Sequence, residues 1–396
     1  MGMNDTPAGE RLHIGLFGRR NAGKSSLINA LTGQEAALVS PEPGTTADPV
    51  AKAMEILPIG PVVLIDTAGL DDTGELGELR VKKSLRVLES CDMALLVSDG
   101  AAPFGDPERE LAAALEKRSI PFLVVRTKRD LPGFRPGAVP GAEEVSVHDP
   151  ASIRQLRERI AALRPAEAAP PPFICDKLHP GDTALLVIPV DEAAPKGRLI
   201  LPQQQVIREL LEAEIPAVAV RDTALERTLA AMREQIRLVI TDSQAFEKVA
   251  RLVPPAIPLT GFSILMARRK GFLETAVNGA RALDAVKTGD RILISEGCTH
   301  HRQCGDIGSV KLPAWIRAYT GQEPVFDFSS GGGFPEDLSP YRLVIHCGGC
   351  MLTGREVRFR RRCAEAANVP FTNYGIAIAK LKGILERALS PFPELR

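Results

Sequence analysis

A glycine-rich segment near the start of the chain has the residue types needed to bind phosphate. It reads Gly18-Arg-Arg-Asn-Ala-Gly-Lys-Ser25, after an apolar run at 13–17 and before a helical pattern at 26–31. In a strand–loop–helix setting, glycines let backbone N–H groups surround a β-phosphate at the positive end of a helix. Lys24 would neutralise β- and γ-phosphate oxygens, and Ser25 would bind Mg²⁺. The segment therefore predicts a P-loop nucleotide site.

Two further motifs follow strand-like runs downstream. Asp66-Thr-Ala-Gly69 comes after the run at 62–65, where a carboxylate can hold Mg²⁺ through water and a glycine amide can meet the γ-phosphate. Thr127-Lys-Arg-Asp130 comes after the run at 122–126. An aspartate there can accept both guanine N1–H and N2–H₂, a pair of donors that adenine does not offer, because an ionised carboxylate has two acceptor oxygens. The three motifs predict a guanine-nucleotide site.

This order and spacing of motifs resembles the GTPase superfamily. The segment Gly44–Pro49 resembles switch I of the branch that includes the tRNA-modification GTPase MnmE and the ribosome-assembly protein Era. In that branch a threonine matching Thr46 or Thr45 binds Mg²⁺, and an asparagine matching Asn21 can bind a K⁺ ion that acts like an arginine finger. The resemblance implies the following nucleotide-contacting residues: Asn21, Ala22, Gly23, Lys24, Ser25, Ser26, Thr45, Thr46, Asp66, Gly69, Thr127, Lys128, Asp130, Ser146 and Val147.

Two departures from the GTPase pattern bear on catalysis. The usual asparagine of the base motif is Thr127, which we expect to loosen nucleotide binding without changing the choice of guanine. Leu70 follows Asp66-Thr-Ala-Gly69, so no glutamine stands there to orient the attacking water. We expect slow intrinsic hydrolysis that K⁺ stimulates. The expected catalytic residues are Asn21, Lys24, Thr46, Asp66 and Gly69, with Ser25, Thr46 and Asp66 on Mg²⁺ and Asn21 on K⁺.

Five of the seven cysteines fall in the last 99 residues, and three of them have the spacing of a metal site. Cys298-Thr-His300 and His346-Cys347-Gly-Gly-Cys350 each follow a strand-like run, at 291–295 and 343–346. The carboxyl ends of strands in an open α/β sheet are where ligand crevices form. Three thiolates suit a Zn²⁺ site, in which one of the two histidines would be the fourth ligand. They equally suit an iron–sulfur cluster in which one iron has no cysteine ligand.

The arrangement C-x-H…H-C-x-x-C behind a GTPase domain resembles the HydF family, the GTPases that mature [FeFe]-hydrogenase. The resemblance covers nearly the full chain. It implies a [4Fe–4S] cluster on Cys298, Cys347 and Cys350, with His300 and His346 near the open iron. It also implies a scaffold that receives a diiron precursor from the radical-SAM enzymes HydE and HydG and delivers it to the apo-hydrogenase.

The other cysteines and a run of arginines have plainer interpretations. Cys304 is an alternative fourth ligand, whereas Cys91 and Cys175 are read as structural. Cys363 is expected to be an ordinary half-buried thiol among Arg358, Arg360, Arg361 and Arg362. That arginine cluster is interpreted as a solvated face or a docking patch for an acidic partner, because the chain has zero net charge and few aromatics lie between the arginines.

Strand-like and amphipathic segments alternate along the chain, and this alternation predicts α/β domains with largely parallel sheets that hold the motifs at their strand ends. Four prolines within 165–172 mark a boundary. We expect three domains, a P-loop GTPase domain at 1–166, a central association domain that dimerises at 173–260, and an iron–sulfur domain at 261–396. The central segment has no chemical motif, and an amphipathic helix is expected over 376–389.

Composition limits the classes of function. Lys+Arg and Asp+Glu are both 49 in 396 residues, which argues against nucleic acid as a partner over the whole surface. The apolar runs are far shorter than the ~18 residues of a membrane span, and the polar N-terminus predicts a cytoplasmic protein with reduced thiols. A second copy of the chain is an expected partner. The alternative hypothesis is an RNA-directed GTPase, for tRNA modification or ribosome assembly, with a structural zinc site.

Overall fold

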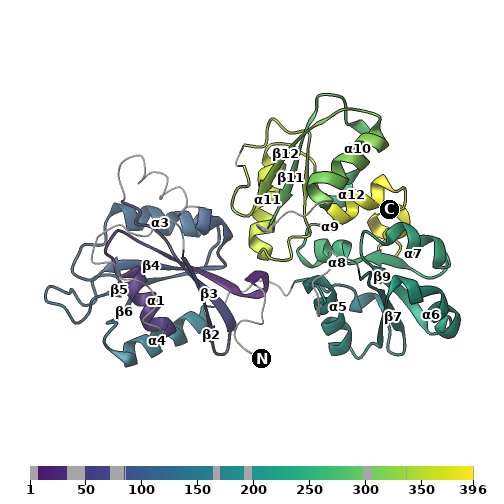
Figure 1. Cartoon of the computed structure of the whole chain (residues 1–396). Helices are drawn as coiled ribbons and strands as arrows, with labels where there is room; N and C mark the ends of the chain where they lie inside the picture. Colours follow the sequence, from purple (N-terminus) through teal and green to yellow (C-terminus); the bar gives the residue numbers. More distant parts are fainter. Residues whose placement is uncertain are drawn as a thin grey trace. The chain divides into compact units, whose positions relative to one another are not determined.

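The computed structural model of the chain describes residues 8–33, 50–71, 84, 86–163, 170–190, 199–297, 306–335 and 337–395. It divides into two compact units, Met1–Ala168 and Ala169–Arg396 (Figure 1). The α/β fold class is confirmed in both units, and the sheets are largely parallel. The second unit contains two sheets, and the expected division into three domains stays a prediction. Among the described residues, no helix has the length and apolar character needed to cross a membrane.

The first unit is built on a six-stranded sheet in the order β2-β3-β1-β4-β5-β6. Only the edge pair β2 and β3 is antiparallel, and the other neighbours run parallel. Its strands are β1 (Leu12–Phe17), β2 (Val50–Ile56), β3 (Gly60–Asp66), β4 (Met93–Asp99), β5 (Phe122–Thr127) and β6 (Glu143–Glu144). Its described α-helices include α1 (Lys24–Thr32), α3 (Asp106–Lys117) and α4 (Pro150–Ala162).

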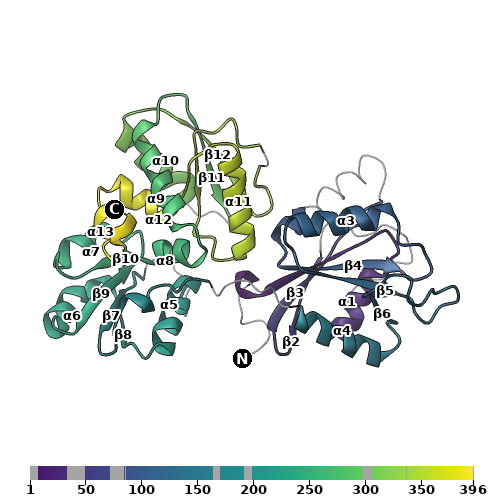
Figure 2. The same cartoon turned by 180° about the vertical axis from the view of Figure 1, so that it is seen from behind.

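Both faces of this sheet are covered, which explains why its central strands read as continuous apolar runs. Helices α1 and α4 pack on one face, where Leu27 and Leu156 join the core with Leu16. Helix α3 packs on the opposite face, where Leu111 joins Leu96 (Figure 2). The polar side chains at the strand ends are therefore held by a rigid three-layer core, with their loops gathered at the carboxyl edge.

The second unit contains two four-stranded parallel sheets, in the orders β10-β9-β7-β8 and β12-β11-β13-β14. The first has β7 (Thr183–Val187), β8 (Ala217–Val220), β9 (Ile236–Thr241) and β10 (Leu259–Gly261), with α5 (Leu201–Glu212), α6 (Leu225–Met232), α7 (Phe246–Leu252) and α8 (Phe262–Arg269). The second has β11 (Arg291–Glu296), β12 (Val325–Ser330), β13 (Leu343–His346) and β14 (Phe371–Asn373), with α9 (Leu273–Arg281), α10 (Leu312–Thr320), α11 (Gly354–Ala366), α12 (Tyr374–Leu381) and α13 (Leu385–Ala388).

One apolar core connects the two sheets of the second unit. Leu186 from β7, Leu265 from α8 and Leu293 from β11 belong to the same buried cluster. Shared burial of this kind stabilises each sheet through the other, because the apolar area of α8 is removed from water only when both are folded. The described residues also form short 3₁₀ segments at Ala8–Glu10, Cys175–Lys177, Asp222–Ala224, Ala282–Ala285 and Pro393–Leu395, and a π-helical turn at Ile307–Lys311.

The helix expected over 376–389 is wrong as a single element. The chain forms α12 up to Leu381 and α13 from Leu385, with Gly383 between them at φ +68°. A left-handed glycine just past a helix is a common C-terminal stop, because it lets the last carbonyls find backbone donors. The helical spacing of apolar residues continues across the break, so the sequence pattern did not indicate that the helix ends there.

Candidate nucleotide and metal sites

The P-loop joins β1 to α1, and its glycines are required by its close packing. A Cβ on Gly18 would lie 2.0 Å from the carbonyl oxygen of Val97, and Gly23 adopts φ +90° at the start of the helix. Lys24 is buried and donates from Nζ to the carbonyl oxygens of Gly18 at 2.9 Å and Arg19 at 2.8 Å. The ammonium group is thus held inside the loop, at the place where phosphate oxygens would receive it.

Ser25 and Asp66 form the part of the site that suits a magnesium ion. Ser25 Oγ donates to Asp66 Oδ2 at 2.5 Å, whereas the buried Asp66 Oδ1 has no hydrogen-bond partner among the atoms described. Burial raises the pKa of the Asp66 carboxyl, and the Ser25 hydrogen bond and the charge of Lys24 oppose this effect. A buried carboxylate oxygen without a donor is costly. A hard cation with oxygen ligands would remove that cost, so the residues present fit Mg²⁺.

The base motif is tied to the P-loop through Thr127. Its hydroxyl donates to the carbonyl oxygen of Ala22 at 2.7 Å, across 105 residues of sequence. Lys128 lies at φ +63° and its Nζ is 2.7 Å from Asp99 Oδ2. Asp130 is exposed, and a hydrogen bond from Ser146 lowers the pKa of its carboxyl. The threonine therefore connects β5 to the phosphate loop and leaves the Asp130 carboxylate facing solvent and ionised.

Of the remaining residues predicted to contact the nucleotide, some are described by the structure and two, Thr45 and Thr46, are not. Asn21 is exposed at φ +60°, and its side chain makes no hydrogen bond to another residue of the described ranges. Gly69 lies against the P-loop, because a Cβ there would be 2.7 Å from the backbone nitrogen of Arg20, and that N–H donates to Asp71 Oδ1 at 2.6 Å. Ser26 and Val147 are half-buried. Thr45 and Thr46, with the rest of 42–49 and with 72–78, lie outside the described residues.

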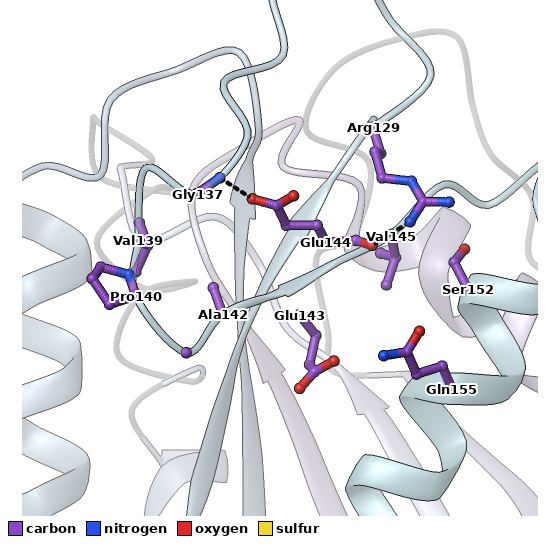
Figure 3. Close-up of a pocket in the computed structure, with 11 residues that line it drawn as sticks. Arg129, Gly137, Val139, Pro140, Ala142, Glu143, Glu144, Val145, Ser152 and Gln155 are labelled. Atoms are coloured by element: carbon purple, nitrogen blue, oxygen red, sulfur yellow. Dashed lines mark hydrogen bonds between the residues drawn. The ribbon is translucent and has the colours of Figure 1, made fainter.

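A polar pocket of about 340 Å³ lies beyond the base motif, between the 137–142 loop, β6 and the start of α4 (Figure 3). The charged groups around it already have partners inside the protein. Glu144 Oε1 accepts from the N–H of Gly137 at 2.6 Å, and Glu143 pairs with Arg159 at 2.6 Å. Arg129 pairs with Asp149 at 2.5 Å. These pairs fix the shape of the loop that follows the base motif.

The cysteine motif lies at the carboxyl end of β13. Cys347 Sγ accepts from the backbone N–H groups of Gly297 at 3.1 Å and Gly349 at 3.4 Å, and Gly349 adopts φ +64°. Burial raises the pKa of the Cys347 thiol, and these two N–H groups oppose the rise. Burial raises the pKa of the Cys350 thiol as well. Backbone donors aimed at a sulfur favour its thiolate form, so this donor set fits a thiophilic metal or an iron–sulfur cluster.

The other predicted members of the cysteine site are not described. Cys298, His300 and Cys304 lie outside the described residues, so their place in the site stays a prediction. Within the described part of the chain, no three His, Cys, Asp or Glu side chains come together as a metal site. Cys363 is half-buried, as expected, and Cys91 is fully buried.

His346 is buried and both of its ring nitrogens are occupied. Nδ1 is 2.7 Å from the carbonyl oxygen of Cys347, and Nε2 is 3.1 Å from Arg360 Nη1. Arginine can only donate, so we assign Nε2 as the acceptor and Nδ1–H as the donor to the carbonyl. Burial and then the charge of Arg360 lower the pKa of His346 to about 3. The neutral ring thus holds the C-x-x-C turn in this structure, and its expected place beside an open iron stays a prediction.

Arg360 organises this edge of the sheet, and the interpretation of its cluster as a solvated or docking face is wrong for this residue. It is 1% exposed and donates to Glu356 Oε1 at 2.8 Å and to the carbonyl oxygen of Gly331 at 2.7 Å. Its guanidinium also lies 5.0 Å from the Phe334 ring. The helical i,i+4 spacing of Glu356 and Arg360 was the available signal. Arg362, on the same helix, is exposed.

Sequence reasoning also missed Lys270, which has no motif around it. Lys270 is buried, and its Nζ donates to the carbonyl oxygen of Leu352 at 2.5 Å, two residues after Cys350. Its charge opposes the rise in the Cys350 pKa. Lys270 therefore holds the chain just after Cys350, whereas His346, with Arg360 bound to its ring, holds the chain at Cys347.

Comparison with known proteins matches different families to the part of the chain that has the P-loop and to the part that has the cysteine motif. Family models match the Hydrogen maturase F dimerization domain at 173–271, the Hydrogen maturase F tetramerization domain at 274–391 and the 50S ribosome-binding GTPase at 13–128. A tRNA modification GTPase MnmE from Bordetella petrii is 36% identical over 155 residues, which cover 39% of this chain and 34% of that relative. A GTPase Der from Wolinella succinogenes is 38% identical over 127 residues, which cover 31% of this chain and 27% of the relative.

The chain thus spans about a third or less of the length of these curated relatives. A crystal structure of Era with MgGDPNP and a piece of 16S ribosomal RNA matches 53% of this chain and 91% of that chain, at 18% identity and a TM-score of 0.35. The GTPase domain match covers the P-loop and ends within the base motif, whereas both maturase domains fall in the second unit.

Proposed function

Because this chain belongs to the hydrogen maturase F (HydF) family, we propose that it hydrolyses GTP and carries an iron–sulfur cluster as a scaffold in [FeFe]-hydrogenase maturation. The observation that carries the proposal is the occurrence of both maturase domains behind a P-loop whose Asp66 leaves a buried carboxylate oxygen open. The first unit is the GTPase domain, and the second has the domains described for self-association.

The nucleotide half of the proposal follows from the P-loop geometry. The backbone N–H groups and Lys24 receive the β- and γ-phosphates, while Asp130 accepts from the guanine base. Ser25 and Asp66 would hold Mg²⁺, which neutralises charge on the phosphate oxygens when it is bound. Leu70 stands where a water-orienting glutamine would stand, so transition-state charge must be met elsewhere. We assign that role to K⁺ held by Asn21, with Thr46 completing the switch.

Hydrolysis of GTP in K⁺ and in Na⁺ buffers tests this half. We expect phosphate release to be faster in K⁺, and Asn21→Ala to reduce the K⁺ rate to the Na⁺ rate. Lys24→Ala should lower the rate by about 100-fold or more in both buffers, because one preorganised charge on the transferring phosphate is lost. Arg154→Ala, at an exposed position of α4, serves as the control. Equal rates in K⁺ and Na⁺ would contradict the role of Asn21.

The cluster half of the proposal places a [4Fe–4S] cluster on Cys298, Cys347 and Cys350, with His300 and His346 nearby. The two backbone N–H groups on Cys347 Sγ support it, since hydrogen bonds to sulfur are among the features that set the potential of such clusters. The diiron precursor is the cargo, received from HydE and HydG and passed to the apo-hydrogenase by a self-associated scaffold. The GTP cycle would gate exchange of these partners, and Thr46→Ala should impair that exchange.

Metal and sulfide analysis with EPR on anaerobically reconstituted protein tests the cluster. We expect about four iron and four sulfide per chain, and loss of the reduced cubane signal in Cys298→Ser, Cys347→Ser and Cys350→Ser. Cys363→Ser is the matched control, because that half-buried thiol belongs to helix α11 and not to the motif. Stoichiometric zinc without sulfide would overturn the cluster and favour the RNA-directed GTPase with a structural zinc site.

A further inference from the structure

The first unit has a second pocket of about 340 Å³, and arginines dominate its polar lining. It lies next to the loop that follows β4, the end of β5 and the segment after the base motif. The residues that bear on its chemistry are Arg109, Arg126, Arg135, Phe104, Val139 and Pro140. None of them takes part in the nucleotide contacts described above, so the pocket is a separate feature of the domain.

Arg126 lines this pocket and is 1% exposed. Its Nη2 donates to the carbonyl oxygen of Gly100 at 2.5 Å and reaches that of Ala102 at 3.4 Å, while its buried Nε has no hydrogen-bond partner. The Phe134 ring lies 5.8 Å from Cζ. Within the described ranges Arg126 forms no ion pair. Its charge helps to lower the pKa of Asp99, but that carboxylate is hydrogen-bonded to Lys128 and not to Arg126. A buried charge is costly unless a counterion meets it directly, so this guanidinium can still gain from a carboxylate in contact with it.

The acids near the pocket are committed elsewhere. Asp99 accepts from Lys128 Nζ at 2.7 Å and from the N–H of Ala101 at 2.9 Å. Arg109 pairs with Asp106 at 3.0 Å, but both side chains are largely exposed, so that pair is weak. Arg135 is exposed and has no ion pair with any residue that the structure describes. The pocket therefore carries an excess of positive charge, in contrast to the balanced pocket of Figure 3.

We propose that this pocket binds a carboxylate carried on a short apolar stem. A guanidinium presents paired donors that match a carboxylate, and Phe104, Val139 and Pro140 offer apolar surface to the stem. The volume is at the lower limit of ligand sites, which suits one such group and excludes a nucleotide. The carboxylate can belong to a small free acid or to the side chain of a partner protein. This inference goes beyond GTP hydrolysis and does not depend on it.

Occupancy of the pocket should be coupled to the nucleotide. Arg126 directly precedes Thr127, whose hydroxyl holds the carbonyl oxygen of Ala22 in the P-loop. A carboxylate that fixes Arg126 would therefore also fix this link. Coupling between two sites is reciprocal, so a bound carboxylate should change GDP affinity by the same factor by which GDP changes carboxylate affinity.

Calorimetric titration of the full chain with sodium glutarate, in the presence of GDP and low chloride, tests the pocket. We expect saturable binding that weakens by about 10-fold in Arg135→Gln and by more in Arg126→Gln. Arg154→Gln, at an exposed position of α4, is the charge-matched control and should leave binding unchanged. Because Arg135 is exposed, that variant decides the question if Arg126→Gln fails to fold. No binding, or equal weakening in the control, would overturn the proposal.

Two further probes identify the source of the carboxylate. A capped pentapeptide with a central glutamate should bind, and the same peptide with glutamine should not. Tighter binding of the peptide than of glutarate assigns the site to a partner protein, and the reverse order assigns it to a free acid. Inorganic phosphate should bind more weakly than either, because it has no stem for the apolar wall. Phosphate binding as tight as glutarate would contradict the proposed ligand.

Discussion

At the carboxyl edge of the first sheet, the buried Asp66 has one oxygen on Ser25 and the other without a partner. At the edge of the β11–β14 sheet, the buried Glu356 accepts from Arg360 Nε at 2.8 Å. Both carboxylates are more than nine-tenths buried, at 6% and 8% exposure. At the nucleotide edge, the Asp66 carboxylate therefore has an oxygen that a ligand can meet. At the cysteine edge, the Glu356 carboxylate is paired with Arg360, which also donates to the carbonyl oxygen of Gly331 in a loop.

The two largest fully buried side chains of the described structure, Arg126 and Arg360, show the same contrast. Arg360 meets a carboxylate, an imidazole nitrogen and a backbone carbonyl. Arg126 contacts two carbonyl oxygens and a ring, and acts on Asp99 through its charge without an ion pair between them. An arginine with its acid inside the fold acts as structure, and removing either partner leaves the other buried and unpaired. An arginine without one is poised for an acid from outside.

The largest effect should come from Arg360→Met. The change leaves the Glu356 carboxylate buried without a counterion and His346 Nε2 without a donor, so we expect a loss of about 3–5 kcal/mol of stability in the second unit. Hydrogen exchange of the β11 and β13 amides measures it, and iron retention should fall in parallel. Arg362→Met, at an exposed position of the same helix, should change neither. Native protection of these strands in Arg360→Met would refute the structural role.

Carboxylate-to-amide changes should have opposite signs at the two edges. Glu356→Gln weakens a charge-assisted hydrogen bond and should lower the stability of the second unit by about 1.5–3 kcal/mol. Asp66→Asn removes a buried charge that the Ser25 hydrogen bond and Lys24 compensate only in part, and should raise the stability of the nucleotide-free first unit by about 1–2 kcal/mol while abolishing Mg²⁺-dependent hydrolysis. Hydrogen exchange of the β1 and β11 amides measures the stability of both units in one sample. The same sign at both sites would break the comparison.

Thr127→Val should have a smaller effect, confined to the nucleotide edge. It removes the hydroxyl that donates to Ala22 and keeps the shape of the side chain. The loss of one such hydrogen bond, about 1 kcal/mol, corresponds to an increase of about fivefold in the dissociation rate of a fluorescent GDP analogue. Thr127→Asn, which restores a polar group, should recover most of the wild-type rate. An unchanged rate in Thr127→Val would show that the link does not reach the P-loop.

The smallest effect should come from Asp176, an exposed carboxylate that accepts two hydrogen bonds of 2.6 Å from Arg268. These bonds lower the pKa of the Asp176 carboxyl below 3.8. A lowered pKa means that the stabilisation is complete above pH 3.8 and is lost as the pH falls through the folded-state pKa.

Because the Asp176 side chain is 39% exposed, Asp176→Asn should cost less than about 1 kcal/mol at pH 7. The difference in thermal midpoint from the wild type should shrink as the pH falls below 3.8 and through the folded-state pKa of Asp176. A difference that persists at low pH would assign the effect to packing, since Arg268 also lies 5.2 Å from the Phe392 ring.

Much of this protein could be predicted from local patterns. The P-loop, Asp66, Asp130 and the C-x-x-C turn each follow a strand whose apolar run is visible in the sequence, and each lies where expected, at a strand's carboxyl end. Periodicity and turn chemistry act over a few residues, so they are encoded locally. The same locality explains the error at 376–389, where the apolar spacing runs through the break at Gly383.

Which polar groups meet depends on contacts between elements that are distant in the sequence. Thr127 reaches Ala22 across 105 residues, Lys270 reaches Leu352 across 82, and the arginine cluster splits into a buried Arg360 and an exposed Arg362. The residue types were plain beforehand, but their burial and partners were not. Burial depends on how elements distant in sequence pack, and a buried charge is defined energetically by the groups around it. The motifs are therefore encoded locally in the sequence, whereas the packing of the sheets determines which of them can meet a ligand.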